Sequence, residues 1–308
     1  MRLVFMGTPA FAATCLLALL QDGAEVCGVY TKPDTPQKRG MKLTQSEVKQ
    51  LALEHGLPVF QPEKLRDDAV YEQLKALAPE LIVVVAYGKI LPQRILDLPK
   101  HGCINIHGSI LPALRGAAPV QWAVLNGLRE TGVSAMYLSA GMDEGDIIDV
   151  RTTLIGETET AGELMDRLAL LGAELLTNTV RAIEDGTAGR TPQDPALATY
   201  APMLTKELSP IDWNKPAWEI LCRVRGLNPW PIATATFGDT PFKVYEAEPA
   251  QTESAAAPGT LLKLDKRGLV VACADGAVRV TRLQAQGGKV MPAPDYFRGH
   301  PIRIPDAI

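Results

Sequence analysis

The chain has 308 residues, of which 46% are hydrophobic and 21% are charged, and its net charge is −4. This composition is typical of a globular protein with a sizeable core, and it excludes both a disordered chain and a strongly basic tail. No apolar run approaches the roughly 20 residues that a membrane-spanning helix needs. We therefore expect a cytoplasmic protein without membrane contact.

Cysteine and histidine usage argues against disulfide and metal chemistry. The five cysteines are scattered without a CxxC pair, and the four histidines lack the spacing of metal ligands such as HExxH. Most of the cysteines lie in apolar runs, which favours reduced and buried thiols. The sequence therefore predicts neither a disulfide framework nor a metal site.

Strands and helices alternate in the first half of the chain. The run LIVVVA at 81–86 is continuous and β-branched, as expected of a strand buried on both faces. Such alternation implies right-handed crossovers and an α/β fold with a mostly parallel sheet. Strands are predicted over 2–6, 25–30, 81–86, 102–107 and 132–138, a short extended piece over 57–60, and helices over 11–20, 46–55, 69–77, 119–126 and 161–183.

The pattern changes after Gly186. Residues 189–205 mix proline, threonine and glycine without periodicity, which predicts a linker between domains at 1–188 and 206–308. A helix is predicted over 218–225, and five short strand-like pieces follow it, separated by turn signals. This spacing is typical of a small antiparallel barrel or sandwich. A slight basic excess in 206–308 indicates a polyanionic partner only weakly, and chance explains it equally well.

The segment MGTPAF at 6–11 follows the first strand and opens a helix, as a dinucleotide-binding turn does. It lacks the GxGxxG pattern, and no P-loop lysine follows it. Gly7 suits a tight turn, and Pro9 suits the first turn of a helix. We therefore interpret the segment as a structural turn near the mouth of a site.

A polar pair ends the apolar strand over 102–107. Side chains alternate along a strand, so Cys103, Asn105 and His107 share one face. In open α/β sheets, ligands bind at the carboxyl ends of parallel strands, where this pair lies. A second polar cluster, GMDEGD, follows the strand over 132–138, and its Asp143 could reach the imidazole. The competing interpretation is an asparagine and a histidine that are hydrogen-bonded within the core.

Asparagine, histidine and aspartate together suit acyl transfer between two amines. An amide N–H stabilises a developing oxyanion, and a histidine donates to the same oxygen or relays a proton. An aspartate orients the imidazole or takes a proton through water. The substrate supplies its own nucleophile, and Ser109 does not lie in the GxSxG turn of a serine hydrolase.

The segment NIHGSILPALRGAAP at 105–119 resembles the active-site signature of the formyltetrahydrofolate-dependent formyltransferases. TGVSAMYLSAGMDEGDI at 131–147 resembles the second segment of this family, which carries an essential aspartate. The similarity extends to FMGTPAFA near the start, to VVAYGKILP at 84–92 and to NPWP at 228–231. The resemblance implies a Rossmann-like formyltransferase domain followed by a C-terminal barrel that is similar to an OB-fold.

The resemblance also implies the reaction and the roles of single residues. Asn105 and His107 would stabilise the oxyanion on the formyl carbon, and Asp143 would hold or deprotonate the imidazole and assist proton transfer from the attacking amine. The donor would be 10-formyltetrahydrofolate. In the members that act on tRNA, the acceptor is methionine esterified to initiator tRNA. The residues implied for the folate site are Ser109, Ile110, Leu111, Pro112, Tyr87, Gly88, Ile90 and Leu91.

A basic loop, KPDTPQKRGMKL at 32–43, connects the second strand to the next helix. Composition alone is typical of a solvated surface loop, but a connection over the carboxyl edge of the sheet favours function. The loop resembles the one that enters the acceptor end of the tRNA in the tRNA-acting members. We expect Lys38, Arg39 and Lys42 to contact phosphates and bases of initiator methionyl-tRNA, and we expect the protein to be a monomer.

Four alternatives remain open from the sequence. A formyltransferase for a nucleotide-linked amino sugar would share the core and a second domain, but it should lack the KRGMKL loop. A glycinamide ribonucleotide formyltransferase would resemble the core only. A binding protein on the same fold would have no need for the complete Asn105, His107 and Asp143 set. A hydrolase of formyltetrahydrofolate would leave the basic loop without a role.

Overall fold

The computed structural model describes residues 1–37, 42–252 and 255–304, and these form two compact units. The first unit comprises Met1–Pro119, Glu130–Thr153 and Met165–Ala201, and the second comprises Val120–Arg129, Leu154–Leu164 and Pro202–Ile308. Most of the segment expected to be a linker therefore belongs to the first unit. The domain boundaries expected at 188 and 206 stay a prediction.

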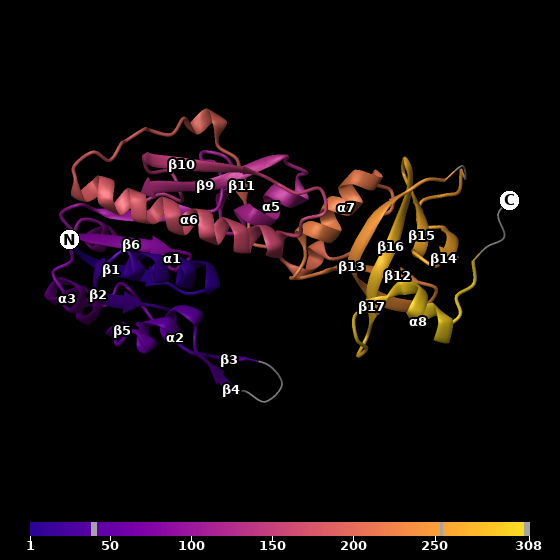
Figure 1. The fold of residues 1–308 in the computed structure, drawn as a ribbon, viewed down its shortest axis with the longest axis horizontal. Helices are drawn as coiled ribbons and strands as arrows, with labels where there is room; N and C mark the ends of the chain where they lie inside the picture. Colours follow the sequence, from indigo (N-terminus) through magenta and orange to yellow (C-terminus); the bar gives the residue numbers. More distant parts are fainter. Residues whose placement is uncertain (38–41, 253–254, 305–308) are drawn as a thin grey trace. The chain divides into compact units, whose positions relative to one another are not determined.

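A seven-stranded sheet forms the centre of the first unit, with the strand order β10-β9-β7-β6-β1-β2-β5 (Figure 1). β1 pairs in parallel with β2 and β6, β2 pairs in parallel with β5, and β6 pairs in parallel with β7. β9 is antiparallel to β7. The mostly parallel sheet is thus confirmed. The strands are β1 (Arg2–Gly7), β2 (Glu25–Tyr30), β5 (Val59–Phe60), β6 (Leu81–Val85), β7 (Cys103–His107), β9 (Glu130–Tyr137) and β10 (Ile147–Leu154).

The two faces of this sheet pack against different helices. Met6, Val84 and Cys103 belong to one buried cluster that includes Leu74 of α3 and Ile95 of α4. On the other face, a Cβ placed on Gly172 of α6 would lie 3.1 Å from Ile106, so this helix packs directly on β7. The helices of the first unit are α1 (Ala10–Gln21), α2 (Glu47–Glu54), α3 (Asp68–Ala76), α4 (Gln93–Leu96) and most of α6 (Ala161–Glu184), whereas α5 (Pro119–Leu125) belongs almost wholly to the second unit.

Some short elements were not predicted from the sequence. β10 has the sequence IIDVRTTL and is mostly half-buried, so its apolar alternation is weak. The four-residue α4 is too short to show a helical period. Two paired two-residue strands, β8 (Arg115–Gly116) and β11 (Tyr200–Ala201), join segments about 85 residues apart in sequence, which no local pattern encodes.

An antiparallel sheet with the order β12-β13-β16-β15-β14 forms most of the second unit, and β17 pairs with β16. This confirms the antiparallel domain, while its closure into an OB-like barrel stays a prediction. α8 was not predicted; Pro292 precedes it, and its Phe297 ring packs 5.8 Å from the Phe242 ring. The elements are α7 (Ala217–Gly226), β12 (Ala233–Phe237), β13 (Thr240–Ala250), β14 (Leu261–Asp265), β15 (Gly268–Cys273), β16 (Gly276–Ala285), β17 (Met291–Pro292) and α8 (Ala293–Gly299).

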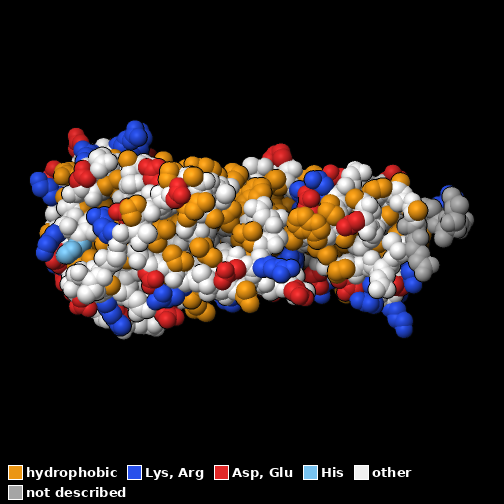
Figure 2. Space-filling view, turned by 90° about the horizontal axis from the view of Figure 1, so that it is seen from above, with side chains coloured by type: hydrophobic (Ala, Val, Ile, Leu, Met, Phe, Trp, Pro, Cys, Tyr) orange, Lys and Arg blue, Asp and Glu red, His pale blue; other side chains and the backbone are white. Residues whose placement is uncertain are grey.

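The surface carries charges of both signs. Acidic and basic side chains are interspersed on the face shown in Figure 2, in keeping with the small net charge of the chain. Among the helices of the described residues, none has both the length and the hydropathy to cross a membrane.

Two buried tyrosines in the same core cluster offer a matched test of this packing. The Tyr30 hydroxyl donates to Gln73 Oε1 at 3.0 Å, whereas the Tyr87 hydroxyl has no hydrogen-bond partner among the described residues. Burial raises the pKa of Tyr87 to about 12, so its hydroxyl stays protonated at neutral pH.

We predict that Tyr87→Phe leaves the free energy of unfolding unchanged or raises it, because no protein hydrogen bond is lost. Tyr30→Phe should lower it by about 0.5–1.5 kcal/mol, the net value of one hydrogen bond. Urea denaturation of both variants measures the difference. A loss in Tyr87→Phe as large as that in Tyr30→Phe would show that the Tyr87 hydroxyl is bonded to a buried water.

Candidate active site

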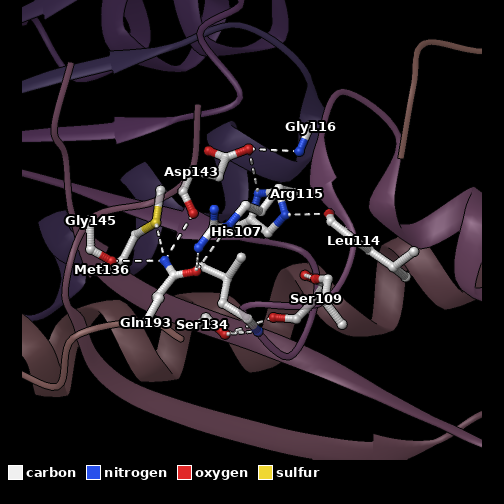
Figure 3. Close-up of polar contacts among 12 residues, drawn as sticks. His107, Ser109, Leu114, Arg115, Gly116, Ser134, Met136, Asp143, Gly145 and Gln193 are labelled. Carbon is white, nitrogen blue, oxygen red and sulfur yellow. Dashed lines mark hydrogen bonds and ion pairs between the residues drawn. The ribbon is translucent and has the colours of Figure 1, made fainter. Parts of the chain in front are cut away.

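Asn105 and His107 lie at the carboxyl end of β7, and Asp143 lies in the loop after β9. Because β9 is antiparallel to β7, Tyr137 at its end pairs with Ile104 near the start of β7. The loop then folds back along the sheet. It brings Asp143 Oδ2 to 3.6 Å from His107 Nδ1 (Figure 3). The structure thus brings together two of the three residues expected to be catalytic, from segments that are far apart in sequence.

The His107 ring lies between two oxygen atoms. Its Nε2 is 2.9 Å from the Leu114 carbonyl oxygen, which can only accept a hydrogen bond, so Nε2 carries a proton. In the neutral ring, Nδ1 is then unprotonated and faces the Asp143 carboxylate. Both side chains are largely buried, with 6% and 16% of their surfaces exposed. A proton taken up at Nδ1 would form an ion pair with Asp143, so the geometry suits proton transfer at this atom.

Backbone groups hold the Asp143 carboxylate in place. Asp143 Oδ2 accepts a hydrogen bond from the Gly116 N–H at 2.8 Å. Asp143 itself has a φ of +53°, a conformation that costs a residue with a Cβ about 1–3 kcal/mol. Two glycines make the close packing around it possible. A Cβ on Gly116 would lie 2.8 Å from the Ala201 carbonyl oxygen, and one on Gly145 would lie 1.8 Å from that of Tyr137.

Gln193 and Arg115 connect this loop to a segment 50 residues further along the chain. Gln193 Nε2 donates to the carbonyl oxygens of Asp143 at 2.9 Å and of Gly145 at 2.8 Å. The Arg115 guanidinium, in a residue that is only 5% exposed, donates from Nε and Nη2 to Gln193 Oε1 at 3.0 and 2.7 Å. The sequence analysis missed both residues. Arg115 lies within the signature segment, but nothing local to Gln193 distinguishes it from a linker residue.

The other side of His107 is held by the same distant segment. The Leu114 N–H donates to Thr199 Oγ1 at 2.9 Å, and the Arg115 N–H donates to the Thr199 carbonyl at 2.8 Å. The pairing of β8 with β11 continues this contact through Tyr200. The carbonyl that accepts from His107 is therefore fixed by main-chain hydrogen bonds.

Asn105 is half-buried, two residues before His107 on β7, and none of the hydrogen bonds described above involves its side chain. Its amide is therefore available to a ligand at the carboxyl end of β7. Cys103, on the same face, packs differently: its thiol lies 3.7 Å from the Ile95 carbonyl, and burial raises its pKa to about 12. A thiol with this pKa is protonated and unreactive at neutral pH, so Cys103 contributes packing.

The residues expected to line a folate site come from the connections after the neighbouring strands β6 and β7. Ser109 Oγ donates to the Ala113 carbonyl at 2.6 Å, and Ser134 Oγ donates to the Ser109 carbonyl at 2.7 Å. The Leu111 N–H donates to Ser134 Oγ, and Leu111–Pro112 is a cis peptide. These bonds hold Ser109, Ile110, Leu111 and Pro112 in one fixed turn beside β9.

The connection after β6 presents its side chains in different directions. Tyr87 and Leu91 are buried in the core cluster, whereas Ile90 is 81% exposed. Gly88 has a φ of +74°, and the Lys32 side chain lies against it. The structure therefore places only part of this expected set on an accessible surface.

Two cavities lie in the first unit. One of about 460 Å³ is lined by residues that include Leu96, His101, Cys103, Leu138 and Arg190. Because Cys103 is the first residue of β7, this cavity lies at the amino end of the strand, away from His107. The other, of about 390 Å³, is lined by Arg115, Glu144, Asp146 and Gln193 among others. In the described ranges 1–37, 42–252 and 255–304, no group of three or more acidic, histidine or cysteine residues could hold a metal ion.

The basic loop at 32–43 begins and ends as a hairpin of β3 (Thr35–Gln37) and β4 (Lys42–Thr44), a pairing that was not predicted. Lys38 and Arg39 lie outside the described residues, and for Lys42 only the backbone pairing with Gln37 is described. The base of the hairpin is well fixed. Lys49 Nζ donates to Asp34 Oδ2 at 2.7 Å and to Gln61 Oε1 at 2.8 Å, and Gln61 Nε2 donates to Asp34 Oδ1 at 2.7 Å. These bonds lower the pKa of the Asp34 carboxyl.

Comparisons with known proteins place the chain in a family. Residues 1–180 match the formyl transferase family model, and residues 203–301 match that of the formyl transferase C-terminal domain. The methionyl-tRNA formyltransferase of Stutzerimonas stutzeri is 48% identical over 96% of this chain and 94% of its own. That of Bacillus velezensis is 44% identical over 100% of this chain and 97% of its own.

Among solved structures, the sugar 3N-formyl transferase WlaRD, crystallised in the presence of dTDP and 5-N-formyl-THF, superposes with a TM-score of 0.68. Its sequence is 17% identical, and the match covers 94% of this chain and 99% of that one. This likeness shows a shared fold. The two family models and the full-length relatives show the family as well as the fold. The chain belongs to the formyl transferase family, among the methionyl-tRNA formyltransferases.

Proposed function

We propose that the protein transfers the formyl group of 10-formyltetrahydrofolate to the α-amino group of methionine on initiator tRNA, giving N-formylmethionyl-tRNA for translation initiation. The observation that carries this is the position of His107 between the Leu114 carbonyl and Asp143, with the Asn105 amide two residues earlier on β7. The arrangement stands in a chain 44–48% identical to methionyl-tRNA formyltransferases over nearly its full length.

Each of the three side chains has a defined part in the proposed mechanism. The α-amine attacks the formyl carbon, and a tetrahedral intermediate forms with a negative oxygen. The Asn105 amide donates an N–H to that oxygen, and His107 donates to it once Nδ1 is protonated. Asp143 stabilises the imidazolium and takes part in moving the proton from the attacking amine. The bond between the formyl carbon and N10 of the folate then breaks, and N10 takes up a proton.

The proposed folate site adjoins these residues. The carboxyl ends of β6 and β7, where Asn105 and His107 lie, are the usual place for a ligand in an open α/β sheet. The turn Ser109–Pro112 and the connection Tyr87–Leu91 flank the same strands. The sugar formyltransferase of the same fold was crystallised in the presence of 5-N-formyl-THF, which supports a folate as the formyl donor.

The proposed tRNA contacts come from the hairpin connection at 32–43. Lys38, Arg39 and Lys42 supply the positive charge that phosphates attract. The hydrogen bonds among Asp34, Lys49 and Gln61 would fix the base of the hairpin while its tip meets the acceptor end. We propose that the protein acts as a monomer in the cytoplasm, where its two substrates occur.

A first prediction concerns the acceptor. The protein should formylate methionine-charged initiator tRNA, with much lower rates for methionine-charged elongator tRNA and for a UDP-linked amino sugar. Incubation with 10-formyltetrahydrofolate and each acceptor, followed by quantification of the formylated product, measures this. Formylation of the sugar nucleotide alone would instead support the sugar formyltransferase alternative, with the same catalytic residues.

A second prediction concerns the oxyanion. Asn105→Ala should lower kcat by about 10²–10³-fold, because one preorganised donor is lost. Asp143→Asn should lower kcat by about 10²–10⁴-fold, the usual range for a group in proton transfer. Single-turnover kinetics and a thermal melt of each variant separate chemistry from folding. A folded Asn105→Ala enzyme with the wild-type rate would disprove the oxyanion assignment.

A third prediction concerns the hairpin. Arg39→Ala should raise the KM for tRNA and leave the KM for the folate unchanged, because the proposed contact of Arg39 is with the tRNA. The effect should shrink as salt rises, since counterion release drives such contacts. Lys64→Ala, an exposed lysine of the same unit, serves as the control. Equal losses on both substrates would mean that the loop has a structural role only.

A further inference from the structure

One side chain outside the proposed catalytic set controls the loop that carries Asp143. Every hydrogen-bonding position of the Gln193 side-chain amide is occupied (Figure 3). Nε2 donates to the carbonyl oxygens of Asp143 and Gly145, and Oε1 accepts two hydrogen bonds from the Arg115 guanidinium. An amide offers two donor hydrogens and two acceptor positions. All four are thus used, which fixes the orientation of the side chain.

Arg115 determines which way the amide faces. Its guanidinium has donors only, so it requires the oxygen of Gln193 on its side and directs Nε2 toward the loop. No carboxylate within salt-bridge distance of Arg115 occurs among the described residues, so the buried cation relies on this neutral oxygen. Exchange of the oxygen and nitrogen positions would break all four bonds at once.

The loop that carries Asp143 depends on the two hydrogen bonds from Gln193. Asp143 is in the left-handed region, and its carboxylate reaches His107 Nδ1 at 3.6 Å with a single backbone hydrogen bond to hold it. The two carbonyls that Gln193 holds belong to Asp143 itself and to the residue two positions later. They therefore bracket the turn that aims the carboxylate.

We infer that Gln193 is a positioning residue for formyl transfer, which acts through Asp143 by holding its loop against the His107 ring. The inference rests on the proposed role of Asp143. It assigns a part in catalysis to a segment that the sequence analysis took for a linker. The hydrogen bonds of Gln193 described here involve neither His107 nor Asn105. Its effect on the rate is therefore expected to pass through the Asp143 loop.

Two substitutions separate positioning from simple stability. Gln193→Glu keeps an oxygen for Arg115 and turns that contact into an ion pair, but it puts a second oxygen against the two carbonyls in place of the donor. A structural role alone predicts a lower melting temperature, with kcat of the folded variant unchanged. Positioning predicts that kcat falls by about 10–100-fold, the usual effect of a lost supporting hydrogen bond, with both KM values within about twofold of wild type. Gln193→Met, which loses all four bonds, should lose kcat similarly.

Gln284→Glu is the matched control. Its amide also accepts from a side chain, the Tyr245 hydroxyl at 3.0 Å, and donates to a carbonyl, that of Gly288 at 2.8 Å, but it lies in the second unit. This variant should keep the wild-type kcat. Thermal unfolding of all variants shows whether each is folded.

The decisive experiment is a double-mutant cycle with Asp143→Asn, measured as kcat for methionyl-tRNA formylation at saturating substrates. If Gln193 acts through Asp143, Gln193→Glu should slow the wild type about 10–100-fold and slow Asp143→Asn by less than about threefold. Equal slowing in both backgrounds, or a wild-type kcat for folded Gln193→Glu, would overturn the inference. A wild-type rate for Asp143→Asn would instead overturn the proposed role of Asp143.

Discussion

The site depends on one hydrogen bond, from His107 Nε2 to the Leu114 carbonyl oxygen at 2.9 Å. This bond fixes where the neutral ring carries its proton, so Nδ1 is the ring nitrogen that faces Asp143. It also requires Leu114 to present its carbonyl inward, which it does with a φ of +59°. That conformation is supported by Thr199, whose hydroxyl and carbonyl accept from the Leu114 and Arg115 N–H groups. The tautomer of one imidazole is thus decided by residues more than 80 positions away.

The antiparallel strand β9 explains how one sheet supplies both sides of that ring. In a purely parallel sheet, the carboxyl ends of all strands lie at the same edge, and crossover connections link each strand to the next. β9 runs the other way beside β7, and the loop after it folds back along the sheet to present Asp143. Gly145 allows the loop to lie against the Tyr137 carbonyl, where a Cβ would not fit. The loop is therefore held at its turn by backbone contact as well as by side chains.

Much of the fold and part of the site could be predicted from the sequence. The run at 81–86 is continuous and β-branched because the strand is buried on both faces, and the polar residues Asn105 and His107 mark the end of the next strand. The contact between His107 and Asp143 was expected from two polar segments that follow neighbouring strands, but β9 is antiparallel to β7, and the loop after β9 has to fold back to make this contact. Gln193 and Thr199 could not be found, because their contacts join distant segments and the residues around them have no periodicity. The pairing of β3 with β4 was not predicted, because Pro33 and Pro36 in this segment indicate a loop.

The site has a bearing on how the protein acquires activity as it folds. Its contacts join residues near positions 107, 115, 143 and 193–199, so closing it requires chain segments with large sequence separations to meet. Loop-closure entropy delays such contacts relative to local helices and to neighbouring βαβ pairs. The strands β1 and β2 can therefore pair before the segment at 193–199 docks. A chain in that intermediate condition would have a native-like sheet and an inactive imidazole, so enzymatic activity would report the last docking event of the first unit rather than the formation of its secondary structure.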